Sequence, residues 1–359
     1  MTSRIVGTCV LLMLAMGACS PMTKIQWTEP NSHRPAFYSS TSGLPVVPLN
    51  GAPKRPFAFE TYPRDFNEAQ VFRFAPCPDS AEQAFRRIPP LPKIPRSQWL
   101  IRGPGSVFIG SKNIELDEVE ISNREWQHFL NCLAADSTQA VYNSFLPSPA
   151  AQPVAGYFTN PFYQYFPVVG VSYEQAVGFC RWRGDMVTTT YSKSATAKKH
   201  PQRFTYRLPT EQEWESAAGN FISRDYGTPC TSVRIEVNPK AAAYLKQRAQ
   251  SEVPVEQIAL DISRFNAAKS ELVWFVCQRE LPYFLRSATP DYIFSTAPNS
   301  YGLFHMIGNV AEMVQEKGVT KGGSYRDPLA ACTIASRGHY AGPAATVGFR
   351  CVSEVTSLK

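Results

Sequence analysis

Among the residues that could do chemistry in this chain, Cys19 has the most informative surroundings. Arg4 is followed by a short apolar run at 10–16, and the small residues Gly17 and Ala18 directly precede the cysteine. This order is typical of a bacterial signal peptide that ends in a lipobox, in which the cysteine is acylated and becomes the first mature residue. Each buried methylene of an acyl chain contributes about 0.8 kcal/mol, so several chains would anchor the protein to a bilayer. The alternative is an ordinary cleaved signal in which Cys19 is incidental.

Export would place the rest of the chain in an oxidising compartment, where disulfides form. The sequence has nine cysteines, of which Cys9 would leave with the signal peptide and Cys19 would be lipidated. Seven cysteines would remain. Because seven is odd, at least one of them is a free thiol unless it bonds to a cysteine of another chain. The seven are Cys77, Cys132, Cys180, Cys230, Cys277, Cys332 and Cys351.

The composition predicts a large folded domain in water. Apolar residues make up 44% of the sequence, which is enough for a sizeable core. The chain of 359 residues is too long for one ordinary domain alone. The net charge of +7 comes from lysines and arginines spread along the chain, so we expect no nucleic-acid partner. No later segment reaches about 18 uninterrupted apolar residues, so contact with the bilayer would be through Cys19.

The chain divides into a signal peptide at 1–18, a tether at 19–97 and a domain at 98–355. Residues 20–97 contain 14 of the 30 prolines, and proline removes backbone donors and resists helix and central strand. We therefore predict an extended tether, although its many aromatic residues indicate that part of it packs along the domain or a partner.

Within the domain, three helices begin at a serine or threonine that has an acidic or amide residue three positions later. This spacing is that of a capping box, in which the two side chains satisfy backbone donors of the first turn. The three pairs are Ser122 with Glu125, Ser172 with Gln175, and Thr210 with Glu213. Residues 220–298 carry apolar residues at three- and four-residue spacing and predict a helical insertion. Short glycine-rich strands follow it, so the fold class is α+β with little regular secondary structure.

Five sequence blocks in order resemble one family, the formylglycine-generating enzymes or sulfatase-modifying factors. This resemblance covers about residues 100–355 and implies a C-type-lectin-like fold. The lipobox, GNVAE and GGSYRD together look most similar to the family's non-enzymatic lipoprotein branch, found in gliding-motility and type IX secretion machinery. The blocks are VFIGS with EVEISNREWQHFL, FPVVGVSYEQAVGFCRW (166–182), RLPTEQEWESAA (207–218), NSYGLFHMIGNVAEM (299–313), and KGGSYRD (321–327) with GFRCV (348–352).

The resemblance implies a Cu(I) site formed by two cysteines five residues apart after the GGS motif, which oxidises a substrate cysteine with oxygen. Here the second position is Cys332, but the first is Asp327. A carboxylate is a hard ligand and a poor substitute for thiolate on Cu(I). We therefore expect no catalysis by this pair, with Cys332 a buried structural thiol. The five histidines show no ligand spacing, which argues against an iron oxygenase: His33, His128, His200, His305 and His339.

The resemblance also implies a calcium site in the GNVAE block, where Asn309, Val310 and Glu312 match the family's oxygen ligands. Hard oxygen ligands on a glycine-led loop suit calcium, and the alternative is that Asn309 caps a turn while Glu312 pairs with an arginine. Cys180 and Cys351 match a disulfide of the family's vertebrate-type members, with two buried thiols as the alternative.

The sequence also predicts salt bridges from Arg207 and Arg350 to Glu211 or Glu215. Two functions remain open. The first is a non-catalytic scaffold, anchored at the outer membrane and docking envelope proteins. Ser20, rather than an aspartate, after the anchor cysteine favours the outer membrane. The second is a copper-dependent oxidase of sulfatase-type cysteine peptides. Carbohydrate binding rests on fold analogy alone.

Overall fold

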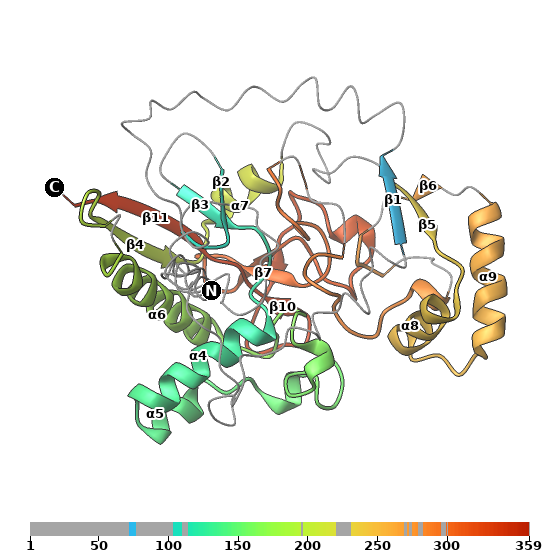
Figure 1. The fold of residues 1–359 in the computed structure, drawn as a ribbon, viewed down its shortest axis with the longest axis horizontal. Coiled ribbons are helices and arrows are strands. Elements are labelled where there is room, and N and C mark those ends of the chain that lie inside the picture. The colour runs from blue at the N-terminus through green and yellow to red at the C-terminus, as the bar shows by residue number, and fades with distance from the viewer. Residues whose placement is uncertain are drawn as a thin grey trace, which may run out of the picture.

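The chain forms a mixed helix-and-sheet structure, in agreement with the predicted α+β class (Figure 1). The computed structural model describes residues 72–76, 103–109, 114–194, 197–219, 231–268, 271–272, 275–278, 283–295, 299 and 301–358. The predicted signal peptide, Cys19, Cys77, Cys230 and nearly all of the predicted tether lie outside these residues. None of the helices described in this way has the length and apolar character to cross a membrane.

One four-stranded sheet joins the two ends of the domain. Its order is β2 (Ser106–Phe108), β3 (Ile114–Asp117), β11 (Val352–Ser357) and β4 (Gln202–Arg207), and all neighbours are antiparallel. The last strand therefore pairs with both an early and a central strand. The alternating burial along β4 shows that one face is covered, and that cover is helix α6 (Tyr173–Ser192).

The predicted helix starts are confirmed. Ser122 caps α4 (Asn123–Asp136) by accepting from the Glu125 amide, and α5 (Gln139–Ser144) follows it. The full capping box, with both hydrogen bonds, is present at the starts of α6 and of α7 (Glu211–Ala218). The apolar faces of α4 and α6 pack against each other, and Trp126 of α4 stacks on Phe179 of α6 with 5.4 Å between ring centroids.

A second four-stranded sheet of very short strands carries the glycine-rich blocks. Its order is β10 (Val347–Gly348), β7 (Ala311–Met313), β8 (Val319–Lys321) and β9 (Gly338–His339). Loops and single 3-10 turns connect it, so little of this region is regular. Gly322 has a φ of +83°, and a Cβ there would lie 2.8 Å from the Met306 carbonyl oxygen. Only glycine allows this close approach of the two backbones. The 3-10 turns are η4 (Pro149–Ala151), η5 (Pro161–Tyr163), η6 (Tyr283–Leu285) and η7 (Leu329–Ala331).

The segment predicted as a helical insertion contains α8 (Pro239–Ala249) and α9 (Val255–Ala267), at one end of the molecule (Figure 1). It also contains strands, because β5 (Thr231–Ile235) pairs with β6 (Glu271–Leu272) and with β1 (Phe72–Pro76). The strand β1 comes from the proline-rich stretch, and it is an edge strand, which is where a sheet tolerates proline. The helices close over an apolar cluster of their own.

Candidate functional site

The GGSYRD block places Asp327 in a turn rather than in a metal site. The Asp327 carboxylate accepts hydrogen bonds from the backbone N–H of Ser324 at 2.8 Å and from its hydroxyl at 2.6 Å. In return the Asp327 N–H donates to the Ser324 carbonyl at 3.0 Å. One oxygen of the Asp327 carboxylate accepts both bonds and holds the loop from Ser324 to Asp327 together, so Asp327 has a structural role here.

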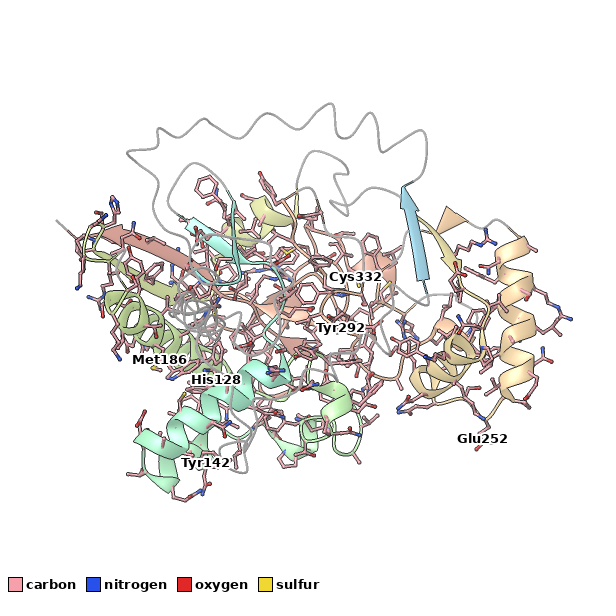
Figure 2. All side chains as sticks on the ribbon, viewed as in Figure 1. His128, Tyr142, Met186, Glu252, Tyr292 and Cys332 are labelled. Carbon is pink, nitrogen blue, oxygen red and sulfur yellow. The ribbon has the colours of Figure 1, made fainter. Side chains whose placement is uncertain are left out.

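Cys332 lies behind this turn, near the middle of the molecule (Figure 2). Its side chain is completely buried, and its sulfur lies 3.4 Å from the carbonyl oxygen of Pro328. A neighbouring thiol, together with burial, raises the pKa of Cys332 far above its usual range. The sulfur is therefore a protonated thiol at neutral pH, and it is out of reach of a substrate peptide in this conformation.

The neighbouring thiol belongs to Cys277, which sequence reasoning did not connect with this site. Both residues belong to the same apolar cluster, and the neighbouring Cys277 thiol is the largest cause of the raised pKa of Cys332. The Gln278 N–H donates to the Asp327 carbonyl at 2.8 Å, and Val276 is bridged to Gly308. The chain around Cys277 is thus clamped between the two glycine-rich blocks. The odd cysteine count indicated only that at least one thiol lacks a partner, and it did not predict that these two cysteines lie close together.

These residues do not fit the copper site that the sequence resemblance implied. Its first position is occupied by the hydrogen-bonded carboxylate of Asp327. Cys277 does supply a second sulfur, which suits Cu(I) better than a carboxylate does. A substrate thiolate would still have to reach a sulfur whose side chain has no exposed surface.

The GNVAE block meets the last strand at a buried ion pair. The Arg350 guanidinium donates to both carboxylate oxygens of Glu312, at 2.6 and 2.8 Å, and both side chains are at most 1% exposed. The indole N–H of Trp214 donates to the same carboxylate at 2.8 Å. Arg350 also donates to the carbonyl oxygens of Asp117 and Phe304. The donors and acceptors are mutually satisfied, as a buried pair requires.

The same contacts do not fit a calcium ion. A guanidinium cation already neutralises Glu312. The side-chain oxygen of Asn309 accepts from the Asp291 N–H at 2.7 Å, and its NH2 group donates to Glu120 at 2.9 Å. Asn309 has a φ of +61°, a conformation that asparagine adopts more readily than most residues. The residues therefore match the alternative of a turn-forming asparagine and an arginine-paired glutamate. Within the described ranges, no group of three or more histidine, cysteine or acidic side chains could hold a metal.

Two further carboxyls lie next to this pair. Burial and the nearby Glu312 charge raise the pKa of Glu120 well above its ordinary value, which favours the neutral form of its carboxyl group. The Oε1 of Glu120 has no hydrogen-bond partner. Glu120 and Asp117 line a cavity of about 20 Å³, which has room for roughly one water molecule. Burial alone raises the pKa of Glu118 to about 7. His305 is buried, not at the surface; burial lowers its pKa to about 4, and its Nε2 lies 3.0 Å from the Tyr292 carbonyl oxygen.

The predicted salt bridges of Arg207 and Arg350 have the wrong partners. Arg207 pairs with Glu213 at 2.7 Å and with Glu354, whereas Arg350 pairs with Glu312. Glu211 and Glu215 instead face Lys321, whose buried ammonium lies 2.6 Å from Glu215. Helix α7 presents these acids on the side where β8 brings its lysine, and sequence spacing alone did not reveal that neighbour.

The predicted disulfide partners lie together. The sulfurs of Cys180, on α6, and Cys351, next to β11, are 3.0 Å apart and buried. Both are thiols in the structure, so the covalent bond stays a prediction. The pair sits beside a second buried ion pair, in which Arg183 lies 2.6 Å from Asp117.

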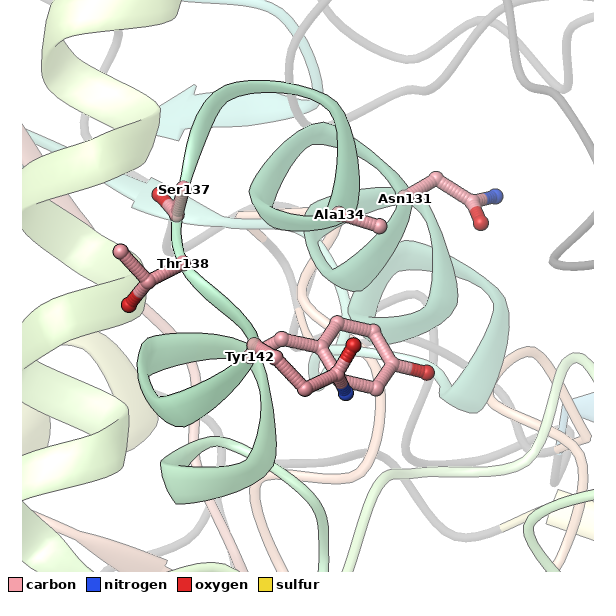
Figure 3. Close-up of a pocket in the computed structure, with 6 residues that line it drawn as sticks. Asn131, Ala134, Ser137, Thr138 and Tyr142 are labelled. Carbon is pink, nitrogen blue, oxygen red and sulfur yellow. The ribbon is translucent and has the colours of Figure 1, made fainter.

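A pocket of about 270 Å³ lies elsewhere, where α4 ends and α5 begins (Figure 3). Its lining has hydroxyl and amide side chains but no charged, thiol or imidazole group that could activate a hydroxyl as a nucleophile. It is formed by Asn131, Ala134, Ser137, Thr138, Gln139 and Tyr142. The pocket is therefore separate from the cysteine and ion-pair clusters.

Comparison with solved structures gives several matches at low identity. PvdO from Pseudomonas aeruginosa is 17% identical over 67% of this chain and 80% of its own, with a TM-score of 0.39. Variable protein 1 of Treponema denticola is 16% identical over 67% and 84% of the two chains, with a TM-score of 0.36. CarF is 16% identical over 69% and 94%, with a TM-score of 0.34. No curated protein matches the chain.

Comparison with protein families gives one match that spans the described sheets and helices from β3 to β11. The model of the sulfatase-modifying factor enzyme 1-like domain matches residues 109–355, which is well over half of the chain. This match confirms the family predicted from the five sequence blocks. The chain belongs to the family of sulfatase-modifying factor enzyme 1-like domains.

Proposed function

We propose that this protein is a non-catalytic scaffold, anchored to the outer membrane through acylated Cys19, that docks other envelope proteins of a secretion or gliding machinery. The observation that carries the proposal is the complete burial of the Cys332 side chain. An oxidase of this family type would have to present that sulfur to the thiol of a substrate. Here the sulfur is a buried, protonated thiol, and such a cysteine is inert.

The blocks that resemble the enzymes have structural partners in this chain. Glu312, Arg350 and Trp214 form one buried network, and Asp327 closes the loop of the GGSYRD block. These contacts stabilise the fold and leave few of the block residues for chemistry. A fold can be kept while its ancestral activity is lost, because activity depends on the site and not on the architecture.

The insertion offers a surface on which a partner could dock. Helices α8 and α9 have their own apolar cluster, and Arg248 of α8 forms a buried ion pair with Asp291, whose N–H donates to Asn309 of the GNVAE block. On the outer face of α9, Leu260 is 46% exposed. Its neighbours one turn away, Glu256 and Arg264, are exposed and of opposite charge. An apolar residue within a polar rim is the arrangement found at protein–protein interfaces, and we assign the partner contact to Leu260.

The test is the size of the native complex in detergent-solubilised envelope, measured by native electrophoresis with an antibody against the chain. We expect the wild type to migrate in a large assembly and Leu260→Asp to release it. The matched control is Leu146→Asp, because Leu146 is similarly exposed, at 41%, but lies between α5 and η4. A wild-type chain that migrates alone as a monomer would contradict the scaffold function. Equal release by both variants would argue against docking through α9.

One observation favours a second candidate, the copper-dependent oxidase. Cys277 places a second thiol against Cys332, so the position lost at Asp327 has a sulfur substitute from a different part of the chain. Two thiolates suit Cu(I). This candidate requires both thiols to deprotonate and the substrate cysteine to gain access. The scaffold reading requires neither, and the two readings differ in what they predict for copper binding and for aldehyde formation.

A further inference from the structure

The contact between Cys277 and Cys332 joins two parts of the chain that are far apart in sequence. Cys277 stands at the end of the insertion, and Cys332 follows η7 in the glycine-rich region. The backbone on both sides of Cys277 is fixed, because Asn309 donates to the Val276 carbonyl at 2.7 Å and Gln278 donates to the Asp327 carbonyl. Gln278 is bridged to Pro328, and the Cys332 sulfur lies 3.4 Å from the Pro328 carbonyl oxygen, so the two cysteines lie on adjacent segments of the chain.

We propose that Cys277 and Cys332 form a disulfide that fastens the end of the insertion to the glycine-rich core. Two S–H bonds break and one S–S bond forms. The two protons and the two electrons go to a disulfide oxidant of the envelope, a dithiol–disulfide exchange protein, which is reduced to its dithiol. The inference rests on the proposed function in one respect, because export brings the chain to that oxidant.

The arrangement favours a structural bond over a reactive thiol. The Cys332 side chain has no exposed surface and Cys277 is only 8% exposed, so oxidation would accompany folding and the product would be shielded from reductants. The bond would also consume both sulfurs that a copper ion could use. The second candidate function and this disulfide therefore exclude each other, and one measurement separates them.

The experiment is disulfide mapping of the full-length chain. Cells are quenched in acid and alkylated with N-ethylmaleimide under denaturing conditions, and the protein is then digested without reductant. A second sample is unfolded, reduced and refolded in a buffer of reduced and oxidised glutathione. We expect a peptide pair that joins Cys277 to Cys332 in both samples, lighter by two hydrogens than the two thiol peptides together. Cys132, which is half-buried and whose pKa is raised to about 11, should carry the alkyl group.

Stability supplies a second readout. We expect Cys277→Ala, Cys332→Ala and the double variant to lose a similar amount, on the order of 5–10 °C in melting temperature, because any one of them removes the same cross-link. Cys132→Ala should lose much less. Additive losses of the two single variants would count against a bond between them.

Two outcomes of the mapping and one outcome of a copper measurement overturn the inference, and each has a different consequence for the proposed function. Alkylated Cys277 and Cys332 beside a bonded Cys180–Cys351 pair would show that oxidation occurs but not here, and the scaffold would stand. Alkylation of both pairs in both samples would overturn the bond even with oxidant supplied. Copper held in a 1:1 ratio, measured by elemental analysis and lost in Cys277→Ala, would overturn the disulfide and the scaffold function together.

Discussion

At the scale of single residues, the pair of Glu312 and Arg350 decides whether the GNVAE block is a structural site or an ion site. Replacing Glu312 with Gln leaves the guanidinium of Arg350 buried without a counter-charge. Breaking a buried pair from one side costs about 3–5 kcal/mol, so we expect that loss in the free energy of unfolding measured with urea. The control is Glu174→Gln, which breaks the exposed pair with Lys317 and should cost less than about 1 kcal/mol. A melting temperature that rises with added calcium in the wild type, but not in Glu312→Gln, would instead identify an ion site.

Glu118 predicts a specific pH dependence of stability. Its pKa is about 7 in the folded chain against an ordinary value of 4.5, so the folded state binds more protons between these values. Stability attributable to this group therefore falls as pH rises from about 4.5 to 7 and is constant above that window. We expect Glu118→Gln to match the stability of the wild type near pH 4.5. At pH 8 its free energy of unfolding should exceed that of the wild type by on the order of 3 kcal/mol. The exposed Glu252→Gln should show no such trend, and a parallel pair of curves for Glu118→Gln would refute the assignment.

At the scale of elements, the capping box of Thr210 and Glu213 stabilises the start of α7. Thr210 accepts from the Glu213 N–H, while the Glu213 carboxylate accepts from the Thr210 N–H at 2.8 Å. Thr210→Ala removes half of this box and should cost about 1 kcal/mol of unfolding free energy. Thr210→Ser should restore most of it. Thr138→Ala is the control, because that cap is exposed and its hydrogen bond is longer, at 3.4 Å. Equal losses at the two caps would show that packing, not capping, sets the α7 start.

The helix starts could be predicted because a capping box is a local pattern of four residues. The five ordered blocks likewise predicted the family and the mixed fold. The partner of Arg350 could not be predicted, because a long side chain finds its acid through the packing of β7 against β10, and Glu211 and Glu215 were equally reasonable choices. The meeting of Cys277 with Cys332 was missed for the same reason. It depends on isolated bridges at Val276 and Gln278 that leave no periodic signal.

The tether shows a similar limit. Its prolines correctly argued against a helix or a central strand at 72–76, but nothing in its composition indicated that this stretch pairs with β5. Edge pairing is weakly encoded in sequence, since it depends on backbone groups that almost any residue supplies. The consequence is that the proline-rich stretch is joined to the insertion by a β-ladder.

At the scale of the whole molecule, anchoring is the property that depends on a single residue. We expect Cys19→Ala to move the chain from the membrane fraction to the soluble fraction after cell lysis and ultracentrifugation, because the variant lacks the cysteine that would carry the acyl chains. Metabolic labelling with an alkyne fatty acid should mark the wild type and not the variant. A wild-type chain that is soluble and unlabelled would indicate an ordinary cleaved signal.

The central claim is that the ancestral oxidation has been lost, and aldehyde formation measures it most directly. The purified full-length chain is loaded with Cu(I) under reducing conditions and incubated in air with a Cys-x-Pro-x-Arg peptide. Mass spectrometry then follows conversion of the peptide cysteine to formylglycine. We predict no conversion above a protein-free control, and the same result for Cys332→Ala. Conversion by the wild type that disappears in Cys332→Ala would contradict the scaffold function and establish the buried sulfur as catalytic.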